Sequence, residues 1–233
     1  GFQRAAWDLR YPVAALPKHE DDEEDFLPAS TNGTLVLPGS YSVKCFQDVD
    51  GIVTELGAAQ NFKVVTDGQS SMNAGDLAGR EEFHRKVARL YRAVSGATHT
   101  AHEVEDRLKS IREALKDTPA AEKQLDAEAD AVERNNRVIL RALSGDSEMQ
   151  KRNEPVASSI NDRIEAIMEG ERFSLAKPTQ SHVEDYNIAA AEFTAQLAKL
   201  HTLVEVDLAK LEKDMEAAGA PWTPGRVPEW SEK

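Results

Sequence analysis

The hydrophobic residues follow two different periods along the chain. Up to about residue 68, apolar and polar residues alternate in short segments, which is typical of β-strands. From about residue 75 onward, apolar residues recur at steps of three and four, which places them on one face of an α-helix. The sequence therefore predicts a mostly helical α+β chain in which the strands come first.

Several segments of the first part predict strands. The opening GFQRAAWDLRYP alternates between two faces, residues 41–46 and 52–56 alternate on either side of the turn sequence Asp48–Gly51, and residues 62–65 add a short strand. A complete sandwich has about seven strands, so these segments predict only a partial β-sandwich. Cys45 occupies an apolar position and is predicted to be buried as a small hydrophobic residue.

The longest helical pattern predicts one helix from about residue 76 to residue 116, roughly 60 Å long. It passes through Gly96, which costs about 1 kcal/mol. Each buried apolar residue contributes about 1.5–3 kcal/mol, less for the alanines, so the helix continues if a partner helix covers it. Its apolar positions, called the first seam, are Phe83, Val87, Leu90, Val94, Ala97, Ala101, Val104, Leu108, Ile111 and Leu115.

A second seam spans residues 125–143 and includes a polar residue, Asn136. An asparagine at such a position is expected to fix the register of two helices rather than to bind a ligand. Thr118 and Pro119 have the residue types of a helix cap and a first helical position, so the helix is predicted to start there.

Two further helices complete the pattern, a shorter one over residues 156–167 and a long one over residues 183–215. Ser181 and Glu184 have capping-box spacing at the start of the long one. The second and third helices together match the length of the first or the last. The lengths predict an elongated antiparallel bundle of three to four helices whose middle layer is broken near residues 144–155. A compact four-helix bundle is the alternative.

Composition excludes some classes of partner. The chain has 41 acidic and 28 basic residues and a net charge of −13. No basic stripe is available to neutralise phosphates, so nucleic acid is not an expected partner. No apolar run approaches the roughly 18 residues of a membrane-spanning helix. The acidic run from Glu20 to Asp25 is expected to form a solvated loop; a calcium site is the alternative, but the run has no glycine to bend it.

Candidate chemistry is sparse. Glu81 and His84 have the Glu-x-x-His spacing of di-iron bundles, but the motif occurs once and Glu81 lies off the seam. His99 and His102 do not match a zincin motif. No nucleophile elbow or phosphate-binding glycine loop is present. We therefore assign no catalytic, metal-binding or cofactor-binding residue and expect no cofactor.

The Pro-rich tail after Gly219 contains two tryptophans that could form an interaction surface, Trp222 and Trp230. The prolines prevent a helix, so these side chains either cap the end of the bundle, which we favour, or dock on a neighbouring surface. Trp7, in the opening strand, is expected to be a core residue rather than a carbohydrate platform, and Asp8 to accept hydrogen bonds from nearby backbone N–H groups.

Nearly the whole chain resembles a protein family, and the more specific motifs lie in the first 65 residues. The segments GFQRAAWDLRYP, LVLPGSYSVKCF and FKVV, followed by helices and EAAGAPW, are similar to the C-terminal region of bacterial proteins with sortilin-like, neuraminidase-type (Asp-box) β-propeller repeats. Such proteins are often labelled glycosyl-hydrolase-like and carry an immunoglobulin-like module like that of flagellar hook-capping proteins. The resemblance implies that an upstream strand completes the sandwich and that a propeller lies before it.

The resemblance also implies a division of the chain. Residues 1–68 would form a partial immunoglobulin-like β-sandwich with an acidic loop, residues 75–218 a long helical bundle, and residues 219–233 a tail. The function expected from it is that of a non-catalytic structural or interaction module of a larger secreted protein, periplasmic or extracellular. The alternative is an accessory domain that binds or shapes glycan substrates. The expected partners are the propeller of the same chain and a second copy joined through the helical seam.

Overall fold

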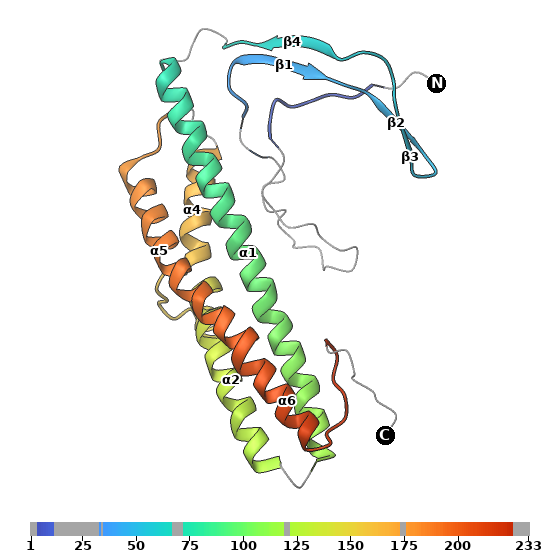
Figure 1. The fold of residues 1–233 in the computed structure, drawn as a ribbon. Coiled ribbons are helices and arrows are strands. Elements are labelled where there is room, and N and C mark those ends of the chain that lie inside the picture. The colour runs from blue at the N-terminus through green and yellow to red at the C-terminus, as the bar shows by residue number, and fades with distance from the viewer. Residues whose placement is uncertain are drawn as a thin grey trace.

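The computed structural model describes residues 4–11, 33, 35–66, 72–118, 122–172 and 176–225. It is mostly helical, with a small antiparallel β region before the helices (Figure 1). In Figure 1 the helices form an elongated bundle, and the β region lies beside one end of it. The helical elements are α1 (Ala74–Lys116), α2 (Glu122–Ser144), α3 (Ser147–Lys151), α4 (Ile160–Arg172), α5 (Gln180–Thr202), the π-helix η1 (Leu203–Leu208) and α6 (Ala209–Ala217).

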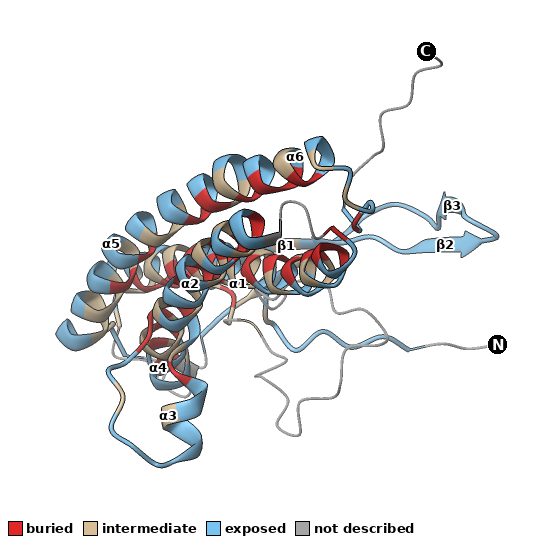
Figure 2. Ribbon diagram, turned by 90° about the horizontal axis from the view of Figure 1, so that it is seen from below, coloured by how far each residue is buried: buried red, intermediate tan, exposed pale blue. Residues whose placement is uncertain are grey.

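Helix α1 confirms the first seam. It begins where the Asn73 side chain accepts a hydrogen bond from the backbone N of Asp76 at 2.9 Å, and it continues through Gly96 to Lys116. Nine of the ten seam positions are buried, and Phe83 is half-buried. Figure 2 shows that buried residues lie on the inward sides of the helices, where the helices face one another.

The middle layer is broken in two, as the helix lengths predict. Gly145, with φ of 88°, ends α2, and Asp146 caps the short helix α3, which the sequence pattern did not indicate. At the start of α4, the backbone N of Ser159 donates to Asp162 at 2.8 Å and the backbone N of Asp162 donates to Ser159 Oγ at 3.1 Å. This reciprocal cap starts α4 at Ile160, so Val156 lies outside the helix.

Asn136 joins α2 to α1. Its side chain is 1% exposed, and its Nδ2 donates to the backbone oxygen of Ala101 at 2.8 Å. A buried amide that binds a neighbouring backbone favours one axial alignment of the two helices, because a shift would leave the amide without its partner. The contact agrees with the register role expected from the sequence.

Two predicted helix starts differ in the structure. Helix α5 begins at Gln180, and its cap is Thr179, whose side-chain oxygen accepts from the backbone N of His182 at 3.2 Å. The predicted cap at Ser181 is therefore wrong, because that residue already lies inside the helix. The hydroxyl of Thr118 donates to the backbone oxygen of Ala114 at 3.0 Å, at the end of α1; Pro119 lies outside the described residues.

The last helix contains a π turn that corrects its phase. Leu200 and Leu203 are buried, and the next fully buried residue is Leu208, five positions later. A π-helix holds one residue more than an α turn, so the chain reaches Leu208 on the core side. Leu211 and Met215 then stay in the core. The sequence signal for this turn is the spacing of Leu200, Val204 and Leu208, two successive steps of four. The prediction of one continuous helix did not use it.

The β region is a pair of two-stranded antiparallel sheets, made of β1 (Gly39–Val43) with β4 (Gln60–Val64) and β2 (Phe46–Val49) with β3 (Ile52–Glu55). Asp50 and Gly51, with φ of 53° and 80°, form the turn between β2 and β3. Positive φ at both central residues is the type I′ geometry that suits a two-residue hairpin. The predicted hairpin is confirmed.

Three expectations about the β region are corrected or not confirmed. The described part of the opening segment, residues 4–11, makes an isolated bridge between Arg10 and Leu35 rather than the predicted strand. The immunoglobulin-like sandwich is not confirmed, since the described strands form only two-stranded sheets. Cys45 is exposed, so its predicted burial is wrong: no layer of described residues covers the hairpin at that point. Asp8 does accept a backbone hydrogen bond, from Arg10 N at 3.1 Å, but at the surface.

Some predictions fall outside the described residues. One is the acidic run Glu20–Asp25, predicted to be a solvated loop or, as the alternative, a calcium site. Another is the predicted interaction residue Trp230. Among the helices that the structure describes, none is both long enough and apolar enough to cross a membrane.

Deleting Glu205, an exposed residue of the π turn, should convert η1 into an ordinary α turn. The downstream core residues then keep their positions, so we expect the free energy of unfolding to change by no more than about 1 kcal/mol. The control is deletion of Glu192, which is exposed within the regular helix α5. That deletion rotates one side of the helix by about 100° relative to the other and should cost more than about 4 kcal/mol through loss of buried leucines. Urea denaturation followed by circular dichroism measures both; equal losses would contradict the assignment.

Candidate functional site

A cluster of polar side chains, three of them buried and His182 half-buried, joins three helices at the end of the bundle nearest the β region. Arg80 and His84 come from α1, Glu171 from α4 and His182 from α5; we call these four residues the Glu171 cluster. Glu171 is 5% exposed. Its Oε2 lies 2.8 Å from His84 Nε2, its Oε1 lies 2.8 Å from His182 Nδ1, and Arg80 Nε lies 3.8 Å from Oε2. Each carboxylate oxygen therefore faces an imidazole, and one guanidinium balances the charge.

Gly170 makes room for this arrangement. A Cβ atom at this position would lie 2.7 Å from two atoms of the His182 imidazole. Because Gly170 has no side chain, the His182 ring lies directly against the backbone of α4 and reaches the neighbouring Glu171. The cap at Thr179 fixes the first turn of α5 and so places His182 opposite α4. The cluster thus depends on how α4 ends and α5 begins.

A second buried acid beside the cluster contacts the N-terminal segment. Glu81 is 6% exposed, and its carboxylate accepts a hydrogen bond from the hydroxyl of Tyr11 at 3.1 Å and also pairs with Arg85. Burial, followed by the charge of Glu81, raises the pKa of Tyr11. The N-terminal segment is therefore attached to the bundle beside the Glu171 cluster, at the junction between the β region and the helices.

The electrostatics of the cluster follow from burial. Burial lowers the pKa of the Arg80 guanidinium, and the charge of Arg10 lowers it further, while Glu171 opposes the change. Burial also lowers the pKa of His84, with Arg80 contributing in the same direction and Glu171 and Glu81 opposing it. A neutral His84 leaves one negative and one positive charge, Glu171 and Arg80, in contact. Ion pairs of this kind are stable in the interior only when hydrogen bonds satisfy their remaining atoms.

The geometry is that of a hydrogen-bonded network between helices. Both carboxylate oxygens of Glu171 already face histidine nitrogens at hydrogen-bond distance. Among the described residues, no group of three or more His, Cys, Asp or Glu side chains is arranged to hold a metal ion. The arrangement joins helices: it ties the α4–α5 corner to α1 by bonds that would leave buried charges unpaired if they were broken.

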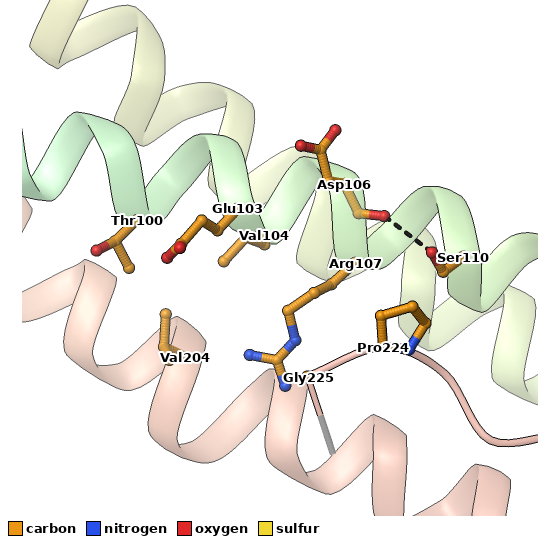
Figure 3. A pocket seen from close by; sticks show the side chains of 9 residues that line it. All are labelled: Thr100, Glu103, Val104, Asp106, Arg107, Ser110, Val204, Pro224 and Gly225. Carbon is orange, nitrogen blue, oxygen red and sulfur yellow. Dashed lines mark hydrogen bonds between the residues drawn. The ribbon is translucent and has the colours of Figure 1, made fainter. Parts of the chain in front are cut away.

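A groove lies further along α1, on the side facing η1 and the tail. It has a volume of about 560 Å³. Figure 3 shows the Arg107 side chain extending from α1 toward Gly225 of the tail, with Val204 of η1 on the opposite wall. Arg107 pairs with the buried Glu212 of α6, so the charged part of this wall is already engaged within the chain. The lining residues are Thr100, Glu103, Val104, Asp106, Arg107, Ser110, Val204, Pro224 and Gly225.

Of the two predicted interaction residues, Trp222 follows α6, away from the Glu171 cluster (Figure 1), and Trp230 lies outside the described residues. Trp222 is 43% exposed, so more than half of its surface is covered within the chain. Sequence reasoning noted the spacing of Glu81 and His84 but missed Glu171 and His182, because their partners come from other helices. The adjacent Gly170 and Glu171 were the available signal, since a glycine inside a helix often marks a close approach.

No protein-family model matches this sequence, and no solved structure matches the chain.

Replacing Gly170 by alanine should destabilise the protein. The new methyl group would collide with the His182 ring, which Glu171 holds in place, so we expect a loss of about 1–3 kcal/mol in the free energy of unfolding. Gly96→Ala is the matched control, because no atom lies within 4 Å of its added Cβ; it should stabilise α1 by about 0.5–1 kcal/mol. Urea titration of the two variants beside the unmodified chain gives both values. A Gly170→Ala variant as stable as Gly96→Ala would show that the close approach has no energetic weight.

Proposed function

We propose that this chain is a non-catalytic structural or interaction module of a larger secreted β-propeller protein. In this proposal the β region is part of an immunoglobulin-like sandwich, the helical bundle is a rigid extension, and the propeller of the same polypeptide is the partner. The location, periplasmic or extracellular, rests on the family resemblance of the first 65 residues. The single observation that carries the module role is the exposure of apolar side chains on the hairpin.

The outer part of the hairpin is apolar on both faces. Val49 pairs with Ile52 on one face, and their side chains are 52% and 70% exposed. On the other face Phe46 and Val53 are 57% and 63% exposed. Figure 2 shows β2 and β3 as exposed and extending away from the helices. An isolated two-stranded hairpin is at best marginally stable in water, so this one is suited to packing against further β structure.

The β1–β4 pair, which leads into the β2–β3 hairpin, carries aromatic side chains on one face that are suited to the core of a sandwich. Trp7, Tyr41 and Phe62 pack together with ring centroids 5.7–6.0 Å apart, and Tyr41 and Phe62 are directly opposite each other in the β1–β4 pair. The other face of this pair carries polar residues, Ser40 opposite Lys63. One aromatic face and one polar face is the pattern of a sheet that is covered on one side. Trp7 is still 45% exposed, which leaves room for a covering layer.

The bundle supports the rigid-extension part of the proposal. Helix α1 has 43 residues, which corresponds to about 65 Å. The three long layers bury their seam within one chain, so the described part of the seam presents no exposed stretch to a second copy. The described part of the seam therefore does not support the expected homodimer through the seam.

The glycan-binding alternative is favoured by the partial exposure of two tryptophans, Trp7 and Trp222. Exposed aromatic rings are suitable platforms for sugars. The two residues belong to opposite ends of the bundle, however: Trp7 packs on β1 and β4, and Trp222 follows α6 (Figure 1). A glycan array with Trp7→Ala and Trp222→Ala variants separates this alternative from the module role, which requires no sugar binding.

Cys45 offers a direct test of the module role. It is the only cysteine of the sequence and is exposed between β1 and β2. If the hairpin is covered in the propeller-containing protein, a maleimide should label Cys45 at least about tenfold more slowly there than in this chain alone, because thiol access limits the reaction. Peptide mapping by mass spectrometry identifies the labelled site.

Ile52→Lys provides the control for this experiment. The side chain is 70% exposed, so the variant of this chain should keep its stability within about 0.5 kcal/mol. In the propeller-containing protein the same change should restore fast labelling of Cys45. Equal labelling rates in the two unmodified proteins would contradict the proposed role of the hairpin.

A further inference from the structure

The Glu171 cluster places titratable groups where three helices meet, and the proposed module role makes no use of it. We propose that the cluster is a pH-sensitive latch, in which protonation of His84 loosens the α4–α5 corner from α1. The inference is independent of the family resemblance, since it rests only on the geometry within the bundle.

His84 is surrounded by charged groups from each element packed near it. From α4, Glu171 lies 2.8 Å away. From α1 itself, Arg80 and Glu81 both act on it. From α5, His182 reaches the other oxygen of Glu171 and so shares its acceptor. The N-terminal segment adds Arg10, whose charge acts on Arg80, and Tyr11, which is bonded to Glu81.

The charges of the buried groups around His84 balance only while His84 is neutral. Glu171 faces Arg80, and Glu81 is paired with Arg85, so each buried carboxylate has a guanidinium as its counter-charge. A proton on His84 would add a positive charge that has no free carboxylate to balance it. His84 is 6% exposed, and water therefore cannot solvate this charge without an opening of the structure. Protonation and opening are thus coupled.

The direction of the pH effect follows from this coupling. Burial lowers the pKa of His84 in the folded protein below its ordinary value. The opened or unfolded state then binds the proton more readily, so stability is complete above about pH 6.5. Stability falls as the pH drops from about 6.5 toward the folded pKa. Carboxylates titrate mainly near pH 4, which leaves the window from about pH 7.5 to 5.5 to the histidines.

The structural consequence is local. Glu171 of α4 contacts His84 of α1 and His182 of α5, and the contact between Tyr11 and Glu81 lies nearby on α1. Opening of the latch would expose the end of α4 and the first turn of α5, while the seam further along α1 would stay buried. The β region is attached beside this corner, so its position relative to the bundle would change with the latch.

Native-state hydrogen exchange of the whole chain at pH 7.5 and 5.5, corrected for intrinsic exchange rates, tests the latch. The opening constant of amides in the second half of α4 and the first turn of α5 should rise about threefold to tenfold at the lower pH, because one proton changes an equilibrium by at most about tenfold per pH unit. In His84→Gln the rise should be less than about twofold. The matched control is His102→Gln, whose side chain is exposed and bonded to Glu105 within α1; it should behave like the unmodified chain.

NMR titration of the histidine rings in the unmodified chain decides the matter if His84→Gln does not fold. His84 should titrate below pH 6.5, and the amide signals of Glu171 and His182 should shift with it. A His84 that titrates at or above 6.5, or an opening constant that is the same at both pH values, would overturn the proposal. A rise of equal size in the unmodified chain and in a folded His84→Gln variant would overturn it as well.

Discussion

Burial of one long apolar seam is the interaction on which the rest of the structure depends. Helix α1 carries apolar residues along its full length, and its exposed face is strongly charged, so the seam is stable in water only when other helices cover it from end to end. α2 is shorter than α1 and cannot do this alone. The chain solves the problem by adding α4 in line with α2 and by returning over both with α5, η1 and α6 (Figure 1).

This arrangement creates two places where the regular pattern has to change. One is the π turn, where an additional residue would rotate the last part of the helix away from the core if it were held in an α turn; the wider turn keeps Leu208 inside. The other is the corner between α4 and α5, where the apolar cover of α1 ends. Here Glu171, His84, His182 and Arg80 take over the contact between the helices through hydrogen bonds and an ion pair.

The helical bundle and the β region differ in how much of their apolar surface they bury within the chain. The bundle buries its seam and pairs its buried charges, whereas the hairpin leaves Ile52 and Val53 mostly exposed. A free-standing surface of this kind is a liability for a soluble protein, because unpaired strands invite association with other chains. The difference supports a module whose helices serve as a stable body and whose β region makes the contacts. The junction at Tyr11 and Glu81 connects the two.

The sequence by itself determined the long helices and the hairpin. Spacing of apolar residues located α1 through Gly96 and the break in the middle layer, and Asp50-Gly51 located the turn, because these features depend on neighbours within a few residues. Only the tertiary structure decided that Glu81 is buried although it lies off the seam, that Cys45 is exposed between β1 and β2, and that Glu171 meets two histidines. Burial and charge pairing are set by segments far apart along the chain, and spacing along one helix carries no information about what packs against its other faces.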